Sequence, residues 1–149
     1  MSGKPQTGRA DSALFLCYLN SIRSPMAEGL ARQMYPDMRI ASCGLAAGEL
    51  DDLMVAVMNE RGIDMSAHES RTLDEIEQPF DVAIALTPEA ADIARRYFAD
   101  SPTRVESWEL PDPTRFYYDV RQMMNDYRAV RDNIEMRLER RFGASRRIS

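Results

Sequence analysis

Residues 13–28, ALFLCYLNSIRSPMAE, decide how the rest of the chain is interpreted. A run of apolar residues ends at Cys17, Arg23 follows six positions later, and a Ser-Pro pair then has the composition of a helix start. A short apolar run bounded by polar residues is typical of a buried strand. The pattern therefore predicts a strand, a loop and a helix, with Cys17 at the point where the strand enters the loop.

In open parallel sheets, ligands bind at the carboxyl ends of the strands, which is where this pattern places Cys17. The loop at 18–24 would turn its backbone N–H groups toward an anion, and the helix N-terminus adds partial positive charge. The same field stabilises a thiolate, and the fork of Arg23 can hold two oxygens of a tetrahedral dianion. The pattern indicates a nucleophile that faces a bound oxyanion. The alternative is that Cys17 is only the buried end of a strand.

Short apolar runs and amphipathic segments alternate along the rest of the chain, which is typical of βα units around a parallel sheet. The four strands are predicted at 13–17, 38–43, 80–86 and 103–108. The helices are predicted from about 25 with Ser24 as the cap, at 50–61, from 88 with Thr87 as the cap, and at 120–142. We expect one α/β domain at 12–143, a flexible lead at 1–11 and a tail at 144–149.

Composition argues against several classes of function. The chain has 149 residues and a net charge of -5, which argues against a nucleic acid or an anionic membrane as the main partner. No apolar stretch approaches the about 20 residues of a membrane span, and the polar N-terminus lacks the apolar region of a secretory signal. Two cysteines are too few for a disulfide framework. We expect a cytoplasmic protein with reduced thiols, and the oligomeric state stays open.

Neither a metal nor another cofactor is expected. The chain has one histidine, so a site with several histidine ligands has little to build on. The glycine-rich motifs that hold nucleotides, Gly-x4-Gly-Lys-Ser/Thr and Gly-x-Gly-x-x-Gly, do not occur in the sequence.

The segment LFLCYLNSIRSPMAEGLA resembles the signature of the low-molecular-weight protein tyrosine phosphatases and the related thioredoxin-coupled arsenate reductases, C-x-G-N-x-C-R-S-P-x-A-E. The resemblance continues through IASCGL, GIDMSAHESRTL, FDVAIALT and LPDP, in unbroken order over about residues 13–140. It implies a four-stranded parallel sheet flanked by helices, with a phosphate-binding loop after the first strand.

The resemblance also implies roles for individual residues. Cys17 would be the nucleophile, Arg23 would clamp the phosphoryl oxygens, and Asp112 would be the general acid. The Ser24 hydroxyl would steady the thiolate, and Ser42 would support the loop by holding Asn20. The residues implied to bind phosphate are Tyr18, Leu19, Asn20, Ser21, Ile22, Arg23 and Ser24. The implied activity is hydrolysis of a phosphomonoester, in a protein (in particular a phosphotyrosine) or in a small molecule, through a cysteinyl-phosphate intermediate.

Departures from the family pattern leave alternatives open. Leu19 stands where the family has glycine, so its side chain must accept an awkward backbone or project toward the mouth of the pocket. Ile22 replaces the second loop cysteine, and the segment after the third strand, ALTPEAADIARRYF, lacks the two cysteines of the coupled reductases. The activity and any redox role of Cys43 are therefore open. The alternatives are an arsenate reductase that uses an external thiol, and a catalytically weak pseudophosphatase that binds phosphorylated partners.

Overall fold

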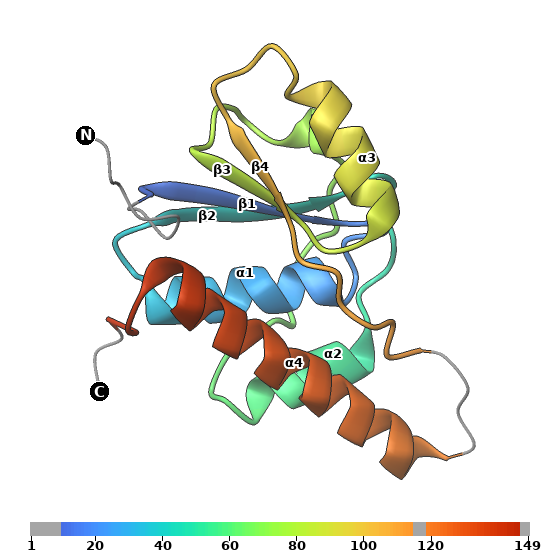
Figure 1. The fold of residues 1–149 in the computed structure, drawn as a ribbon. Helices are drawn as coiled ribbons and strands as arrows, with labels where there is room; N and C mark the ends of the chain where they lie inside the picture. Colours follow the sequence, from blue (N-terminus) through green and yellow to red (C-terminus); the bar gives the residue numbers. More distant parts are fainter. Residues whose placement is uncertain (1–9, 115–118, 147–149) are drawn as a thin grey trace.

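The computed structural model describes residues 10–114 and 119–146. At its centre lies a sheet of four parallel strands in the order β2-β1-β3-β4 (Figure 1). The strands are β1 (Ser12–Cys17), β2 (Arg39–Gly44), β3 (Val82–Ala85) and β4 (Arg104–Ser107). The predicted α/β fold with a four-stranded parallel sheet is thereby confirmed. Of the expected lead and tail, residues 1–9 and 147–149 lie outside the described residues.

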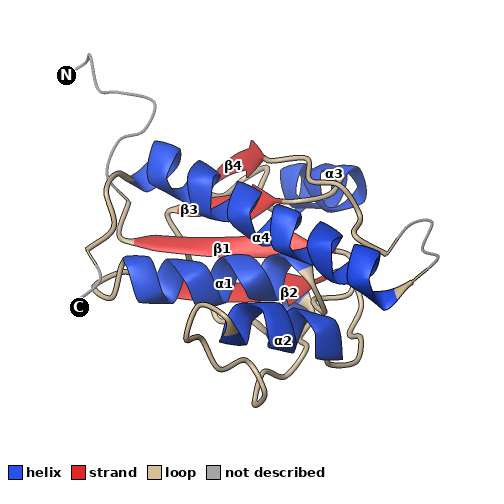
Figure 2. Ribbon diagram, turned by 90° about the horizontal axis from the view of Figure 1, so that it is seen from below, coloured by secondary structure: helices blue, strands red, loops and turns tan. Residues whose placement is uncertain are grey.

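Helices cover both faces of the sheet (Figures 1 and 2). The helices are α1 (Arg23–Met34), α2 (Asp52–Asn59), α3 (Pro88–Tyr97) and α4 (Val120–Phe142), and a short 3-10 helix, η1 (Leu73–Glu75), precedes β3. Helices α1 and α4 lie on one face with α2 beside them, and α3 lies on the other. Within 10–114 and 119–146, no helix combines the length and the apolar character that a membrane crossing requires.

Strand β1 is buried on both faces, and its side chains divide between two cores. Ala13 and Phe15 join the core that includes residues of α1 and α4, whereas Leu14 and Leu16 join the core that includes residues of α3. This division follows from the alternation of side chains along a strand. Because β1 lies between β2 and β3, the carboxyl end of the strand at Cys17 is held in the middle of the sheet.

The start of α1 differs from the prediction. The helix begins at Arg23 with Ile22 as its N-cap residue, and no side chain caps it. Ser24, the predicted cap, instead lies inside the first turn, where its hydroxyl contacts Cys17 and Asn20. The cap prediction at Thr87 is confirmed, because the Thr87 hydroxyl accepts a hydrogen bond from a first-turn N–H of α3.

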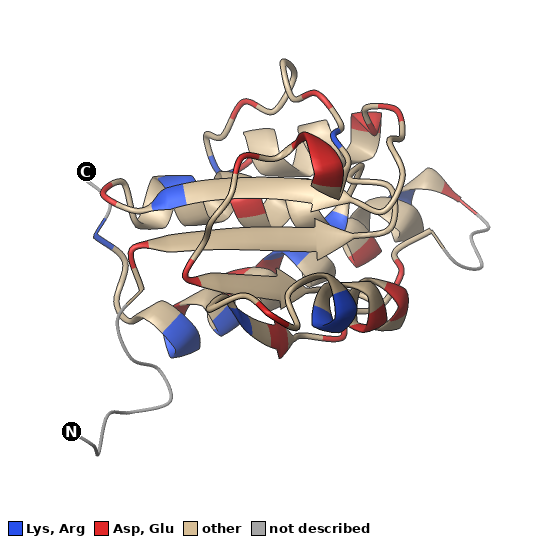
Figure 3. Cartoon of the chain, turned by 90° about the horizontal axis from the view of Figure 1, so that it is seen from above, with Lys and Arg blue, Asp and Glu red and all other residues tan. Residues whose placement is uncertain are grey.

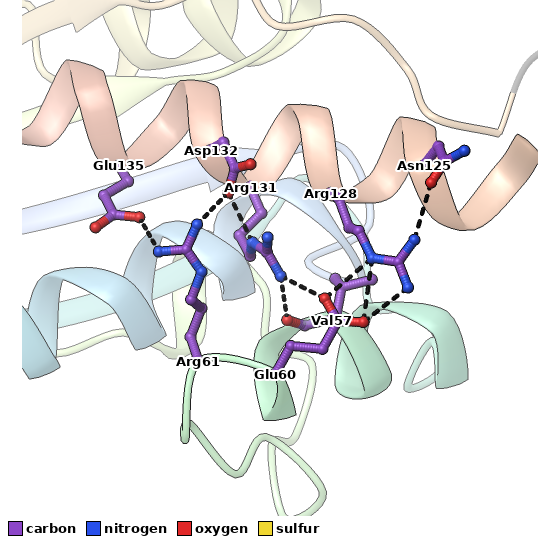
Figure 4. A network of polar contacts seen from close by, with 8 residues as sticks. All are labelled: Val57, Glu60, Arg61, Asn125, Arg128, Arg131, Asp132 and Glu135. Carbon is purple, nitrogen blue, oxygen red and sulfur yellow. Dashed lines mark hydrogen bonds and ion pairs between the residues drawn. The ribbon is translucent and has the colours of Figure 1, made fainter.

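A network of charged side chains joins the end of α2 to α4 (Figure 4). Glu60 accepts hydrogen bonds from Arg128 at 2.8 Å and from Arg131 at 2.8 Å. Beside it, Arg61 contacts Asp132 and Glu135, each at 2.7 Å. The hydrogen bonds from Arg128 and Arg131 lower the pKa of Glu60 from 4.5 to about 2.

This network predicts an effect on stability that depends on pH. A carboxylate whose pKa is lowered by folding stabilises the folded state above its unfolded pKa, and that contribution is lost as the pH falls toward its folded pKa. We expect Glu60→Gln to lower the thermal midpoint by about 2 °C at pH 7, since Glu60 is partly exposed to solvent. The deficit should shrink as the pH falls below 4.5 toward about 2. Thermal unfolding of both proteins at several pH values checks this, and a deficit that stays constant with pH contradicts it.

Candidate active site at the end of strand β1

The nucleophile loop, defined here as residues 18–22, connects β1 to α1. Cys17 is the last residue of β1 and is only 3% exposed. The loop turns sharply at Asn20, whose φ of 56° is the only positive value at a non-glycine residue in the described part of the chain. Asparagine tolerates this left-handed conformation better than most residues do. The turn brings the loop back over the carboxyl end of β1.

Hydroxyl and amide groups lie behind the nucleophile loop, and one of the hydroxyls contacts the thiol. The Ser24 Oγ atom is 2.8 Å from Cys17 Sγ. Asn20 Nδ2 donates hydrogen bonds to Ser24 Oγ at 2.8 Å and to Ser42 Oγ at 2.9 Å. Asn20 and Ser24 are completely buried, so their side chains support the loop from inside and do not line the open hollow in front of it.

The hollow in front of Cys17 has a volume of about 230 Å³. Its lining consists of Cys17, Tyr18, Leu19, Ser21, Ile22, Arg23, Asp112 and Thr114. The structure thus brings the predicted nucleophile, cation and acid to one site, although Asp112 lies 95 positions after Cys17. Arg23 Nη1 donates to the carbonyl oxygen of Leu110 at 3.1 Å, which links the start of α1 to the segment that carries Asp112.

Asp112 lies at the start of a turn. Its Oδ1 atom accepts hydrogen bonds from the Thr114 backbone N–H at 2.9 Å and from the Thr114 hydroxyl at 2.5 Å. These bonds occupy one carboxyl oxygen and orient the side chain. A carboxyl group placed in this way at the hollow can exchange a proton with a ligand bound in front of Cys17.

Leu19 is accommodated without a left-handed backbone. Its side chain lines the hollow and is 42% exposed, so it projects toward the mouth. On its other side lies Gly48, where a Cβ atom would be 2.9 Å from the Leu19 Cβ and 2.5 Å from the Ser21 hydroxyl. Ser70 joins the two backbones, because its hydroxyl donates to the Leu19 carbonyl and accepts from the Gly48 N–H.

This close packing predicts that Gly48→Ala disturbs the nucleophile loop. The added methyl group must displace Leu19 or Ser21, and a shift of about 1 Å at a reacting centre can reduce turnover by about 100-fold. We expect turnover to fall by about 10-fold to 100-fold while the thermal midpoint changes little. The double variant Leu19→Gly/Gly48→Ala should recover part of the loss, because it removes one of the two clashing side chains. Equal turnover in Gly48→Ala and the wild type contradicts the prediction.

The segment at 68–71 braces the nucleophile loop, and none of its residues was predicted to lie at the site. The Arg71 N–H donates to Asn20 Oδ1 at 2.9 Å, and His68 Nε2 is 3.3 Å from the Asn20 carbonyl oxygen. The segment GIDMSAHESRTL carried a family resemblance, but about 50 positions separate it from the loop. Nothing local in the sequence connects these residues to Asn20.

Cys43 is poorly suited to act as a second reactive thiol beside Cys17. It is completely buried on β2, and burial, with a smaller contribution from nearby Cys17, raises its pKa from 9.0 to about 12. The thiolate is the nucleophilic form, so Cys43 is unreactive at neutral pH. Among the described residues, no group of three or more His, Cys, Asp or Glu side chains is placed to hold a metal ion.

A sequence model of the family "Low molecular weight phosphotyrosine protein phosphatase" matches residues 12–146. The arsenate reductase of Bacillus subtilis is 35% identical over 127 residues, which cover 84% of this chain and 90% of that protein. The glutaredoxin arsenate reductase of Synechocystis is 30% identical over 128 residues, which cover 85% and 92%.

Solved structures are similar over most of their length. An arsenate reductase in the phosphate-binding state has a TM-score of 0.73 at 28% identity, covering 87% of this chain and 95% of that one. The tyrosine phosphatase amsI of Erwinia amylovora has a TM-score of 0.74, covering 99% and 98%. At 23% identity, this structural similarity shows a shared fold alone.

Proposed function

We propose that this chain, which belongs to the low molecular weight phosphotyrosine protein phosphatase family, is an enzyme whose Cys17 thiolate attacks the central atom of a tetrahedral oxyanion. The observation that carries the proposal is the hollow that Cys17, Arg23 and Asp112 line together. The nucleophile has a hydroxyl 2.8 Å away to stabilise its charge, a guanidinium to hold the anion, and an acid to protonate what leaves.

The names of the curated relatives favour arsenate over a phosphomonoester as the substrate, so the expectation of a phosphatase takes second place. In the first step, Cys17 Sγ bonds to arsenic and Asp112 protonates the hydroxide that leaves. A thiolate then attacks Cys17 Sγ and forms a disulfide, and the electron pair of the S–As bond stays on arsenic as arsenite is released. A second thiol reduces the disulfide and regenerates Cys17. Two thiols are oxidised for each As(V) reduced to As(III).

Both of these thiols must come from outside the chain. The sequence contains two cysteines, and Cys43 is buried with a pKa raised to about 12. The reductase proposed here therefore uses an external thiol, in contrast to the internal cysteine relay that the resemblance implies for the thioredoxin-coupled enzymes. The external thiol must reach Cys17 through the open hollow in front of the nucleophile loop.

Hydrolysis of a phosphomonoester is the second candidate, and Asp112 in the hollow favours it. Cys17 Sγ bonds to phosphorus while Asp112 donates a proton to the oxygen of the leaving alcohol. Asp112 then takes a proton from water, the water oxygen attacks phosphorus, and the S–P bond breaks to release phosphate and the thiolate. This cycle needs one cysteine and no external thiol, which fits the cysteine content of the chain.

One comparison of substrates separates the two candidates. The purified protein is assayed with arsenate plus reduced glutathione and glutaredoxin, and in parallel with p-nitrophenyl phosphate from about pH 5 to 8. Arsenite formation that depends on both thiol and protein supports the reductase, whereas release of nitrophenol without thiol supports the phosphatase. If neither substrate is turned over and phosphate still binds, the enzyme proposal is wrong and a phosphate-binding protein remains.

A further inference from the structure

We propose that Glu28, on the buried face of α1, is a positioning residue that sets the direction of the hydrogen bonds leading to Cys17. In this arrangement the Ser24 hydroxyl proton points at the thiolate. The inference rests on Cys17 as the nucleophile of the proposed function. It goes further because it assigns a role in that reaction to a side chain that does not touch the hollow.

Glu28 is a buried carboxylate with two defined partners. It is 8% exposed and lies on α1, facing β2. Its Oε1 atom accepts a hydrogen bond from the Ser42 hydroxyl, and its Oε2 atom contacts Arg32 at 2.7 Å. An ionised carboxylate can only accept hydrogen bonds. The single hydroxyl proton of Ser42 is therefore directed to Glu28, and Ser42 Oγ can only accept from its other neighbours.

The amide of Asn20 is held in one orientation from its opposite side. Its Oδ1 atom accepts from the Arg71 N–H at 2.9 Å, and Nδ2 faces the two serines. Nδ2 carries two protons and donates one to Ser42 Oγ and one to Ser24 Oγ. Both N–H groups of Asn20 Nδ2 have acceptors only while the hydroxyl oxygens of Ser24 and Ser42 accept from them.

The last link is the hydroxyl of Ser24. Because Ser24 Oγ accepts from Asn20, its own proton is free to be donated to Cys17 Sγ at 2.8 Å. The competing acceptor, the Cys43 carbonyl oxygen, is farther away at 3.4 Å. A hydrogen bond donated to a charged group favours the charged form, so this bond favours the Cys17 thiolate.

Removal of the Glu28 acceptor would reverse the chain of bonds. The Ser42 proton would then meet only the N–H groups of Asn20. It would gain a partner if the Asn20 amide turned its oxygen toward the serines and gave up the bond from the Arg71 N–H. Glu28 and Arg71 thus hold the same amide orientation from opposite sides, and loss of Glu28 removes one of the two supports. In the turned orientation Asn20 would accept the Ser24 proton, and the Cys17 thiolate would lose its donor.

The charges around Glu28 allow the hydrogen-bond effect on Cys17 to be distinguished from a simple charge effect, because the two act in opposite directions. A cavity of about 170 Å³ beside it is also lined by Arg32, His68, Glu69 and Arg71. Loss of a negative charge from this cluster would by itself favour the Cys17 thiolate, since like charges repel. The hydrogen-bond chain predicts the opposite, because the thiolate loses a donor when the Glu28 acceptor is removed.

The test measures the reactivity of Cys17 and does not require turnover. Alkylation by iodoacetamide is followed by mass spectrometry from about pH 4 to 9 in the wild type, Glu28→Met and Glu28→Gln. Methionine removes the acceptor at similar volume, whereas glutamine keeps one acceptor oxygen. We expect the pH midpoint of alkylation to rise by about one unit in Glu28→Met, which is about a tenfold loss of rate below both midpoints. Glu28→Gln should fall between Glu28→Met and the wild type.

Two comparisons separate positioning from general destabilisation. If Glu28 acts through Ser42, its substitution should have little further effect on the midpoint in a Ser42→Ala background. Glu60→Gln, which removes a carboxylate from the network between α2 and α4, should leave the midpoint unchanged. If Glu28→Met does not fold, Glu28→Gln with and without Ser42→Ala carries the same comparison.

Each outcome either supports or overturns the proposal. A midpoint that falls or does not move in Glu28→Met overturns it, as does an effect that persists undiminished in the Ser42→Ala background. If the expected shift appears while the wild type turns over neither arsenate nor p-nitrophenyl phosphate, the proposed function fails and the positioning role stands.

Discussion

Cys17→Ser is expected to abolish turnover of both arsenate and p-nitrophenyl phosphate, a loss of at least about 10,000-fold. A serine hydroxyl is almost completely protonated at neutral pH and is a far weaker nucleophile than a thiolate. Neither Arg23 nor Asp112 can replace the missing nucleophile, and Cys43 is buried with its pKa raised to about 12. Release of arsenite and of nitrophenol is measured at a protein concentration high enough to detect a rate about 10,000-fold below that of the wild type.

The matched measurement for this variant is oxyanion binding. Cys17→Ser keeps Arg23 and the backbone of the nucleophile loop, so phosphate should still bind, as isothermal titration calorimetry can show. A Cys43→Ser variant should keep its turnover, because Cys43 does not line the hollow. Residual turnover in Cys17→Ser above about 0.01% of the wild-type rate would contradict the assignment of Cys17 as the nucleophile.

Most of the features that could be predicted depend on residues that lie close together in the sequence. The apolar run before Cys17 and the arginine six positions later place a thiol and a guanidinium at the end of a central strand. Both features act within one strand, loop and helix, so the local pattern contains the information. The same holds for the cap at Thr87, where the hydroxyl and the next residue, Pro88, set the start of α3.

The supports of the nucleophile loop depend on contacts that no local pattern encodes. Arg71 and His68 contact Asn20 although about 50 positions separate them in the sequence. Gly48, which packs against Leu19, lies in the loop that follows β2. The misplaced cap at Ser24 has the same origin. The local sequence suits a capping serine, but the hydroxyl is taken by Cys17 and Asn20 once the loop has folded.

The two departures in the loop are tolerated for different reasons. Ile22 lines the hollow and packs against the core on the α1 side of the sheet, so its apolar side chain has partners where the family has a cysteine. Leu19 fits because Gly48 has no side chain at the point of contact. The hollow therefore stays open in spite of both substitutions, which is the geometric basis for proposing an enzyme in place of a binding protein alone.

Asp112→Asn is expected to have the second largest effect, a loss of about 100-fold or more in turnover. General acid catalysis contributes about 100-fold to 10,000-fold, and asparagine cannot donate a carboxyl proton to the leaving group. Its side-chain oxygen can still accept from the Thr114 N–H and hydroxyl, so the turn should persist. The loss therefore measures the proton transfer and not the collapse of the segment.

The nature of the leaving group makes this prediction specific. An aryl phosphate with a weakly acidic phenol needs protonation more than p-nitrophenyl phosphate does, so Asp112→Asn should slow phenyl phosphate more than the nitrophenyl ester. The hydroxide that leaves arsenate is a still poorer leaving group, and arsenate reduction should depend on Asp112 at least as strongly. Thr114→Val serves as the matched control, because it removes one hydrogen bond to Asp112 and leaves the carboxyl group in place. Equal losses for phenyl and nitrophenyl phosphate would mean that Asp112 orients the site and does not transfer the proton.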